Sequence, residues 1–250
     1  MDVVETARRL WRTRVPSVVR ERANHVRAAR REAAWRKSRD LGDLRRMDPF
    51  STWGSSRGGP IDRVYINQFV EKNAADLRGR ALEVMDDHYL KRYGTGVTQI
   101  DILDVDDTNP RATFHADIVD APNIPDDTFE CVVLTQVLPL VYDGRAALRT
   151  AHRILVPGGV LLATTGGISR IAPLESPVYG HWWHYTSMSA KRLSEEVFGE
   201  GNVEVETYGN VLAATGFLFG LGLHDLSMEE LSVRDPAYEV TIAIRAVKRV

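Results

Sequence analysis

Acidic residues lie in or directly after two short apolar runs, where carboxylates could hold a ribose. Glu83 lies within the run 81–85, and Asp101 and Asp104 lie near the end of the β-branched run 97–103. Such runs, bounded by turn residues, predict two buried parallel strands. A ligand of a parallel α/β sheet sits beyond the carboxyl ends of the strands, where an acidic residue can bind ribose hydroxyls. The spacing therefore indicates a nucleoside-bearing cofactor, with either Asp101 or Asp104 on the ribose.

The loop after the first run indicates the class of cofactor. Dinucleotide-binding turns carry G-x-G-x-x-G, which lets the backbone approach a pyrophosphate. Here the loop is MDDHY, and the carboxylates of Asp86 and Asp87 would repel a phosphate. A cofactor with an adenosine, a cationic centre and an amino group, but no phosphate, tolerates these carboxylates better. S-adenosylmethionine fits that description.

A cluster of aromatic and histidine residues occupies the segment SPVYGHWWHYT, residues 176–186. Methyl transfer to a hydroxyl requires loss of a proton, and an imidazole with a pKa of about 6.5 is a suitable base. We therefore predict His181 or His184 as the catalytic base, and Trp182 and Trp183 as substrate-binding residues. The alternative is that the tryptophans pack against the sheet while the histidines bond to the backbone.

Four segments carry a resemblance to a known family. They are LEVMDD, VTQIDILDVD, FHADIVDAPNIPDDTFECVVLTQVLPLVYD and HRILVPGGVLLATTGG. Together they resemble the class I S-adenosylmethionine-dependent methyltransferases, over roughly Gly58 to the C-terminus. The chain departs from the family pattern at Met85, which stands where the first glycine of the Gly-rich loop is usual. It resembles a branch with an aspartate-rich first loop, found with bacterial sugar and natural-product biosynthesis enzymes and sometimes beside glycosyltransferases.

The resemblance implies a set of cofactor-binding residues. It places Asp117 near the adenine amino group, and Gln136 in the loop beside the transferring methyl group. The cofactor-binding set that we predict is Glu83, Met85, Asp87, Asp101, Asp104, Asp117 and Gln136.

The remaining pattern predicts an α/β fold with a Rossmann-like, seven-stranded, mostly parallel sheet. Continuous apolar runs such as 129–135 predict strands that are buried on both faces. The expected strands are 81–85, 97–103, 112–118, 129–135, 160–165, 203–208 and 238–247. We expect the last strand to be antiparallel and to pair with the sixth at one edge. The VPGG motif predicts a turn, and Ser187 or Ser189 is the expected cap of a helix at 189–198.

The segment before the first strand offers further candidate residues. A loop rich in Gly, Ser and Pro, residues 48–60, precedes a predicted helix at 61–77. In the family this segment often closes over the site, which makes Trp53, Arg57 and Tyr65 candidate substrate-binding residues. The alternative is that Tyr65 belongs to the core.

The N-terminal part predicts a basic helical arm. Residues 1–46 hold 14 Lys and Arg against 6 Asp and Glu, whereas the rest of the chain holds 18 against 28. We therefore divide the chain into an arm and loop, residues 1–57, and a methyltransferase-like α/β domain, residues 58–250. We expect the arm to pack on the acidic body, on a second subunit or on a partner enzyme. Without an RNA-binding signature, a nucleic-acid partner is not expected.

Composition limits the remaining choices. The only cysteine, Cys131, lies in an apolar run, which indicates a core residue in a reducing compartment. Without a signal core or a spanning apolar stretch, a cytoplasmic protein is expected. The carboxylates show no metal-ligand spacing, so no metal is expected.

Three functions are compatible with the sequence. The first is an S-adenosylmethionine-dependent O-methyltransferase acting on a small-molecule acceptor, a sugar or glycosylated natural product; N-methylation of an amino sugar remains possible. The second is a catalytically inactive methyltransferase-like partner of another biosynthetic enzyme, because fold does not fix function. The third is a repurposed enzyme that catalyses a non-methylating reaction on the same fold.

Overall fold

The computed structural model describes residues 45–173 and 175–249. A compact unit begins at Asp48 and runs through the rest of the chain. Its first residues pack on a distant segment, because the Phe50 N–H donates to the Phe219 carbonyl at 2.7 Å and the Ser51 hydroxyl to the Gly220 carbonyl at 2.8 Å. The predicted helical arm lies almost wholly outside the described residues.

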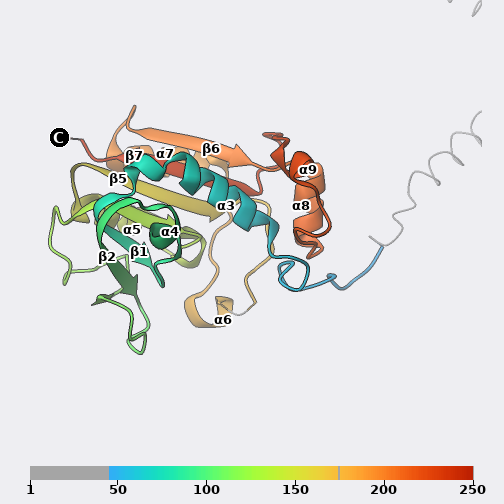
Figure 1. The fold of residues 1–250 in the computed structure, drawn as a ribbon, viewed down its shortest axis with the longest axis horizontal. Coiled ribbons are helices and arrows are strands. Elements are labelled where there is room, and N and C mark those ends of the chain that lie inside the picture. Colours follow the sequence, from blue (N-terminus) through green and yellow to red (C-terminus); the bar gives the residue numbers. More distant parts are fainter. Residues whose placement is uncertain (1–44, 174, 250) are drawn as a thin grey trace, which may run out of the picture. The chain divides into compact units, whose positions relative to one another are not determined.

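A seven-stranded sheet in the order β3-β2-β1-β4-β5-β7-β6 forms the centre of this unit (Figure 1). The strands are β1 (Arg78–Val84), β2 (Gly96–Asp104), β3 (Phe114–His115), β4 (Phe129–Thr135), β5 (Leu155–Gly166), β6 (Val203–Tyr208) and β7 (Thr241–Val247). Strands β1 to β5 pair in parallel, and β7 pairs antiparallel with both β5 and β6. The predicted fold class is confirmed.

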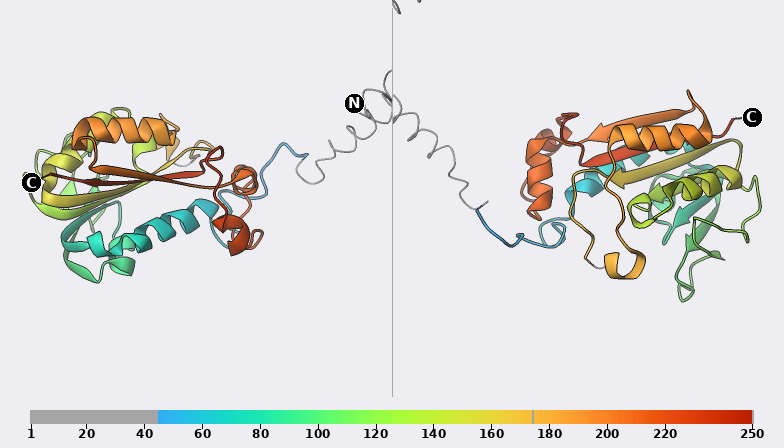
Figure 2. Two further views of the ribbon diagram at one scale, coloured as in Figure 1. Left: turned by 90° about the horizontal axis from the view of Figure 1, so that it is seen from above. Right: turned by 180° about the vertical axis from the view of Figure 1, so that it is seen from behind.

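Helices cover both faces of the sheet, and Figure 2 shows α7 on one side and α3 on the other. The α-helices are α3 (Ile61–Lys72), α4 (His88–Tyr93), α5 (Gly144–Ile154), α6 (Ser176–Tyr179), α7 (Ser187–Phe198), α8 (Val211–Leu218) and α9 (Met228–Ser232). Within residues 45–173 and 175–249, two short 3-10 turns, η2 (Ala74–Asp76) and η3 (Leu138–Leu140), add to them. None of the helices among the described residues is long and apolar enough to span a bilayer.

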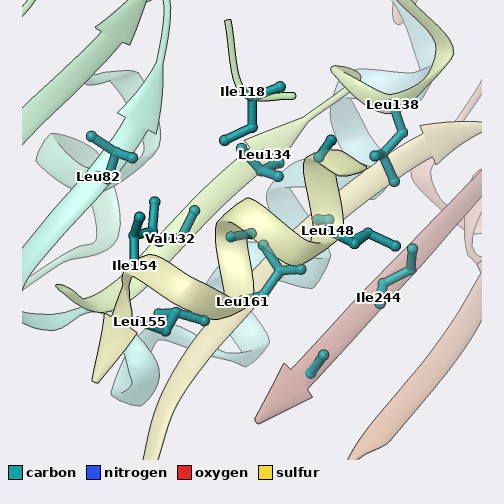
Figure 3. Close-up of a cluster of buried hydrophobic side chains, with 14 of the residues drawn as sticks. Leu82, Ile118, Val132, Leu134, Leu138, Leu148, Ile154, Leu155, Leu161 and Ile244 are labelled. Atoms are coloured by element: carbon teal, nitrogen blue, oxygen red, sulfur yellow. The ribbon is translucent and has the colours of Figure 1, made fainter. Parts of the chain in front are cut away.

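The two cores follow from the two-residue period of a strand, which sends alternate side chains to opposite faces. On β4, Val132 and Leu134 join the core under α5 and α7, whereas Cys131 and Val133 join the core under α3 and α8. Figure 3 shows the first of these cores, with Leu148 of α5 among strand residues. Cys131 is fully buried, as predicted, and burial raises the pKa of its thiol.

Three local predictions need correction. The VPGG motif is not a turn but part of β5, where the Gly158 N–H donates to the Lys248 carbonyl at 2.8 Å and continues the pairing. The third strand is only two residues long. The cap of α7 is Thr186: its hydroxyl accepts from the Ser189 N–H at 3.2 Å, while the Ser189 hydroxyl accepts from the Thr186 N–H at 3.0 Å.

Candidate functional site

A cavity of about 500 Å³ lies at the carboxyl ends of β1, β2 and β4. This is the end of an open α/β sheet at which ligands bind, and the volume lies in the range of small-molecule sites. The lining residues are Val84, Met85, Leu103, Asp104, Val105, Ala116, Asp117, Ile118, Val119, Thr135, Gln136, Val137, Leu140, Val141, Tyr142, Asp143, Val178, Tyr179 and Trp182.

The charges that line the cavity are all negative. Asp104, Asp117 and Asp143 contribute carboxylates, and the described lining includes no lysine, arginine or histidine. Most of the other lining side chains are aliphatic or aromatic. Such a cavity favours a ligand that carries positive charge and disfavours phosphate.

Two lining residues have left-handed backbone conformations at the ends of neighbouring strands. Met85 follows β1 with φ 70°, and Gln136 follows β4 with φ 58°. Each backbone N–H is held by the adjacent strand: Met85 donates to the Leu103 carbonyl at 2.9 Å, and Gln136 to the Thr164 carbonyl at 2.8 Å. Glycine adopts this conformation most readily, which is the physical reason that Met85 is an unusual residue here.

Asp104, at the carboxyl end of β2, lies where a ribose-binding acid is expected. Its Oδ1 accepts from the Asp106 N–H at 2.9 Å, and its Oδ2 accepts from the Asn109 amide at 2.7 Å. These two bonds fix the orientation of the carboxylate and leave further lone pairs on both oxygens.

Asp101, the other predicted ribose ligand, does not line the cavity. Its side chain is 1% exposed, and its Oδ2 accepts from Arg80 Nε at 2.7 Å and from the Gln99 amide at 3.2 Å. The carboxylate is thus already hydrogen-bonded within the sheet, two residues before β2 reaches the cavity at Leu103.

Glu83 also lies outside the cavity lining, and its carboxylate holds the start of α4. Both oxygens accept from the Tyr89 N–H at 3.1 Å, and Oε2 accepts from the Leu90 N–H at 2.9 Å. Burial raises the pKa of Glu83 to about 7, against the lowering effect of these backbone bonds. Glu83 therefore fixes the loop after β1 through hydrogen bonds to the start of α4 and does not contact a ligand in the cavity.

Asp87 pairs with cations outside the cavity. It forms ion pairs with Arg111 and with Lys91, the latter at 2.8 Å, and these partners lower the pKa of its carboxyl. The three residues line a separate shallow depression. The charge of Asp87 is thus largely compensated on the outer side of the loop.

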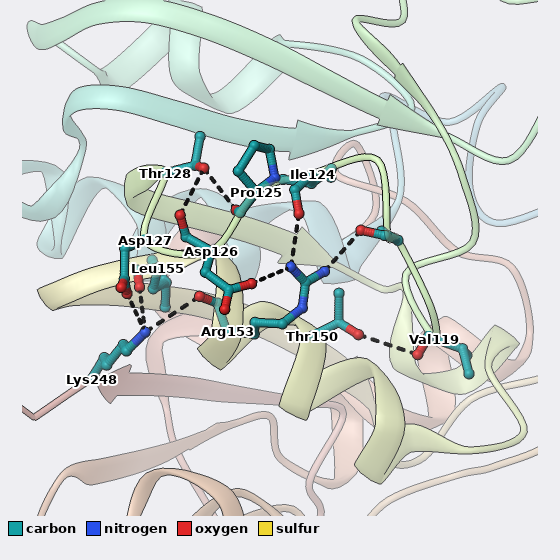
Figure 4. Close-up of polar contacts among 11 residues, drawn as sticks. Val119, Ile124, Pro125, Asp126, Asp127, Thr128, Thr150, Arg153, Leu155 and Lys248 are labelled. Atoms are coloured by element: carbon teal, nitrogen blue, oxygen red, sulfur yellow. Dashed lines mark hydrogen bonds and ion pairs between the residues drawn. The ribbon is translucent and has the colours of Figure 1, made fainter.

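The loop from Asp117 to Thr128 contributes its first three residues, 117–119, to the cavity lining, and α5 holds this loop in place (Figure 4). Arg153 donates to the carbonyls of Ala121 and Ile124 at 2.8 and 2.7 Å, and to the Asp126 carboxylate at 2.7 Å. Asp117, which lines the cavity, accepts from the Val119 N–H at 2.9 Å. Arg153 therefore fixes the loop that presents the predicted adenine-binding carboxylate.

The two predicted catalytic histidines do not line the cavity. The Ala172 N–H donates to His181 Nδ1 at 3.2 Å, and the ring of His181 packs edge-on against His184 with centroids 4.9 Å apart. Burial lowers the pKa of His181. These contacts match the alternative in which a histidine bonds to the backbone, and the catalytic role stays a prediction.

Trp182 lines the cavity, whereas Trp183 lies next to it. Both rings contact Tyr142, with centroid distances of 5.1 Å for Trp182 and 6.0 Å for Trp183. The tryptophans thus form an aromatic cluster with Tyr142 at the cavity rather than packing against the sheet.

The candidates from the segment before β1 lie away from the cavity. Trp53 packs on Phe217 of α8, with centroids 5.2 Å apart. Arg57 forms an ion pair with Asp225. Tyr65 is buried against Tyr208 in the core, which is the alternative reading of that residue.

Several lining residues were not singled out from the sequence. Tyr142 and Asp143 belong to the segment LVYDG, which precedes α5. An Asp before a helix is a capping signal, and indeed Asp143 Oδ1 accepts from the Ala146 N–H at 2.9 Å. That signal predicts a cap but does not show that the residue also faces a ligand site. No cluster of potential metal ligands occurs in the described part of the chain.

The cavity suits S-adenosylmethionine in its chemistry. Asp104 and Asp117 offer acceptors to ribose hydroxyls and to an adenine amine, and the aliphatic residues Val105 and Val119 offer apolar walls to a base. A sulfonium and an ammonium group match the negative lining, and no phosphate has to be accommodated.

Comparison with known proteins supports the fold. Residues 78–163, from β1 to most of β5, match the family described as a methyltransferase domain. A phospholethanolamine N-methyltransferase 2 from Haemonchus contortus superposes with a TM-score of 0.50 and 14% identity, covering 78% of this chain and 54% of that chain. At this identity the likeness shows the fold alone.

Two further structures align with lower scores. The YcgJ protein from Bacillus subtilis has a TM-score of 0.46 and 13% identity, covering 75% of this chain and 99% of that chain. The cyclase SpnF has a TM-score of 0.48 and 16% identity, covering 81% of this chain and 86% of that chain. No curated protein matches the chain. The chain thus has a Rossmann-like methyltransferase fold, with a methyltransferase domain match over residues 78–163.

Proposed function

We propose that this protein is an S-adenosylmethionine-dependent methyltransferase that methylates a hydroxyl of a sugar or glycosylated natural product in a bacterial biosynthetic pathway. The observation that carries the cofactor part is the cavity at the strand ends, whose described charges are three carboxylates and no cation. A nucleotide with phosphates would be repelled there, whereas a sulfonium cofactor would be attracted.

Different residues of the cavity would bind different parts of the cofactor. Asp104 binds the ribose and Asp117 binds the adenine amine. Met85 and Gln136, which line the cavity at the ends of neighbouring strands, would contact the remainder of the cofactor. When bound, S-adenosylmethionine supplies a methyl group on a sulfonium sulfur, which leaves as a neutral thioether once the acceptor oxygen bonds to the methyl carbon.

The aromatic side of the cavity supports a sugar as acceptor. Tyr142 and Trp182 line the cavity and are largely exposed, and the C–H groups of a sugar ring are attracted to the negative face of an aromatic ring. No cationic side chain of the described lining would recognise a phosphorylated acceptor. The bacterial pathway follows from the sequence resemblance alone.

A binding protein without catalysis is the second candidate. Met85 replaces the usual glycine in a left-handed conformation, and the two candidate histidine bases lie outside the cavity lining. Both observations favour a protein that has the methyltransferase fold but does not catalyse methyl transfer.

Calorimetric titration distinguishes the two. We expect S-adenosylmethionine and S-adenosylhomocysteine to bind with micromolar affinity, and ADP, which shares the adenosine but carries phosphates, to bind much more weakly. If neither S-adenosylmethionine nor S-adenosylhomocysteine binds, the proposed methyltransferase activity is rejected and the non-catalytic function is favoured. If ADP binds as tightly as S-adenosylhomocysteine, the electrostatic argument is wrong.

A further inference from the structure

Three aromatic side chains form an exposed cluster at the edge of the cavity. Tyr142, Trp182 and Trp183 are 68%, 51% and 44% exposed. The rings of Tyr142 and Trp182 are nearly perpendicular, at 78°, whereas those of Tyr142 and Trp183 are inclined by 34°. The rings of Tyr142 and Trp182 therefore meet at a corner instead of stacking, and all three side chains keep a large exposed area.

Hydrogen bonds hold this cluster in place although its faces are exposed. The Trp183 indole donates to the Tyr142 carbonyl at 3.0 Å, and the Trp182 backbone N–H donates to the Pro139 carbonyl at 2.8 Å. These bonds tie the loop after α6 to the segment before α5. Exposed aromatic area that is held in this way on a soluble domain indicates a binding surface.

Asp143 adds a carboxylate next to the cluster. It follows Tyr142 in the chain and lines the cavity with Tyr142 and Trp182. Its Oδ1 caps α5 by accepting from the Ala146 N–H at 2.9 Å, which fixes the carboxylate. Among the described residues no hydrogen-bond partner is recorded for Oδ2, so this oxygen can accept a proton or a hydrogen bond from a ligand.

We infer that Tyr142, Trp182 and Asp143 form the acceptor subsite for an uncharged sugar ring, and that Asp143 accepts the proton of the methylated hydroxyl. The inference rests on the proposed function and deepens it. The sugar packs on the aromatic corner, and Asp143 Oδ2 accepts the hydrogen bond of the hydroxyl that reacts. Asp143 thus takes the role that the sequence pattern assigns to His181 or His184, neither of which lines the cavity.

The proton balance is simple. The hydroxyl oxygen would bond to the methyl carbon as the bond from that carbon to the sulfonium sulfur breaks, with the bonding pair staying on sulfur as a neutral thioether. The hydroxyl becomes acidic as the new bond forms, and its proton would pass to Asp143 Oδ2. A carboxylate is a weak base, but it suffices for a proton that becomes acidic during the reaction. Asp143 is exposed, so it returns the proton to water after product leaves.

Binding of the sugar can be tested without turnover. Protein saturated with S-adenosylhomocysteine is titrated with the methyl glycosides of glucose, galactose and rhamnose, with methyl glucosaminide and with glucose 6-phosphate, while the indole N–H resonances of Trp182 and Trp183 are recorded by NMR. We expect at least one neutral glycoside to shift the Trp182 resonance and glucose 6-phosphate to leave it unchanged. If no neutral glycoside shifts it, or only glucosaminide does, the inference is overturned.

Substitutions then separate the two roles, using a glycoside that both binds and is methylated. Asp143→Asn should lower kcat by about 100-fold or more, with KM changed by less than about threefold. Trp182→Ala should raise KM by about 10-fold with little change in kcat, and Trp182→Phe should restore it. Glu200→Gln, an exposed carboxylate that does not line the cavity, is the charge-matched control.

The affinity for S-adenosylhomocysteine distinguishes this inference from the proposed function. All four variants should still bind it, and Glu200→Gln should bind it as tightly as the parent chain does. Unchanged kcat in Asp143→Asn overturns the role of Asp143, and absence of turnover with every glycoside while the cofactor product binds overturns the sugar subsite. Failure of the parent chain to bind S-adenosylhomocysteine rejects the proposed function instead.

Discussion

Two aspartates on β2 show how position on a strand decides the role of a residue. Asp101 and Asp104 are three residues apart, and because side chains alternate along a strand they point to opposite faces of the sheet. Asp101 is buried against Arg80, whereas Asp104 reaches the cavity at the strand's carboxyl end. Sequence spacing alone allows either residue to bind the ribose, since it does not show where the strand ends.

Substitution of these two aspartates tests the assignment. Asp104→Asn should weaken S-adenosylhomocysteine binding by about 10-fold or more, because hydrogen bonds to a charged group contribute about 1.5–3 kcal/mol. Asp101→Asn is the matched control. It should leave the affinity unchanged in calorimetry and lower the melting temperature, because Arg80 loses its ionic partner.

Glu83 gives a prediction about pH. Its pKa is raised from an ordinary 4.5 to about 7, so the folded protein binds this proton more tightly than the unfolded chain does. The contribution of this proton to the free energy of unfolding is fully present below pH 4.5 and is lost as pH rises through 7.

Urea unfolding of the parent chain and of Glu83→Gln at pH 5 and pH 8 measures this effect. The difference in unfolding free energy, parent minus variant, should fall by an amount on the order of 2 kcal/mol between the two pH values. A difference that increases with pH would show that the carboxylate, held by the N–H groups of Tyr89 and Leu90, is the favoured form instead.

At the scale of elements, the strands are more predictable than the turns. The apolar run 129–135 coincides with β4, because a strand buried on both faces must be apolar throughout. The VPGG motif misleads, because glycine and proline favour turns locally, whereas pairing with the residues after β7 keeps the backbone in the strand. β3 is also shorter than the predicted strand 112–118, since it ends at His115 and the chain continues as a loop that Arg153 holds by hydrogen bonds.

The role of Arg153 can be tested against a neighbour on the same helix. Arg153→Met should lower stability by about 1–3 kcal/mol, since two carbonyls and one carboxylate lose a charged donor. Amide hydrogen exchange in residues 117–128 should accelerate, and S-adenosylhomocysteine should bind more weakly because Asp117 lies on that loop. Arg149→Met, at an exposed position of α5, should change none of these.

At the scale of the whole molecule, the sheet separates two hydrophobic cores, and β7 at its antiparallel edge contributes side chains to both. Ile244 of β7 is fully buried under the α5 and α7 side, whereas Ala243 faces the α3 and α8 side. This division is predictable from the alternation of apolar residues along the strands. The cavity is less predictable, since its wall residues come from five separate segments that meet only in the folded chain.

Ile244→Ala tests how much the packing of β7 contributes to the free energy of unfolding. We expect a loss of about 2–5 kcal/mol in unfolding free energy, measured by urea denaturation, because the truncation leaves a cavity in a packed core. Val233→Ala removes an exposed valine and should change stability by less than about 0.5 kcal/mol. A comparable loss in both variants would contradict the assigned core.

The position of β7 also sets the order in which the chain can fold. Among the described strands, β6 pairs with β7 alone, and β7 lies between β5 and β6 although it comes last of the seven along the chain. During synthesis β6 therefore waits for residues 241–247 before it can join the sheet. Until then the edge of β5 that β7 covers is unpaired, and an unpaired strand edge in an incomplete chain favours aggregation.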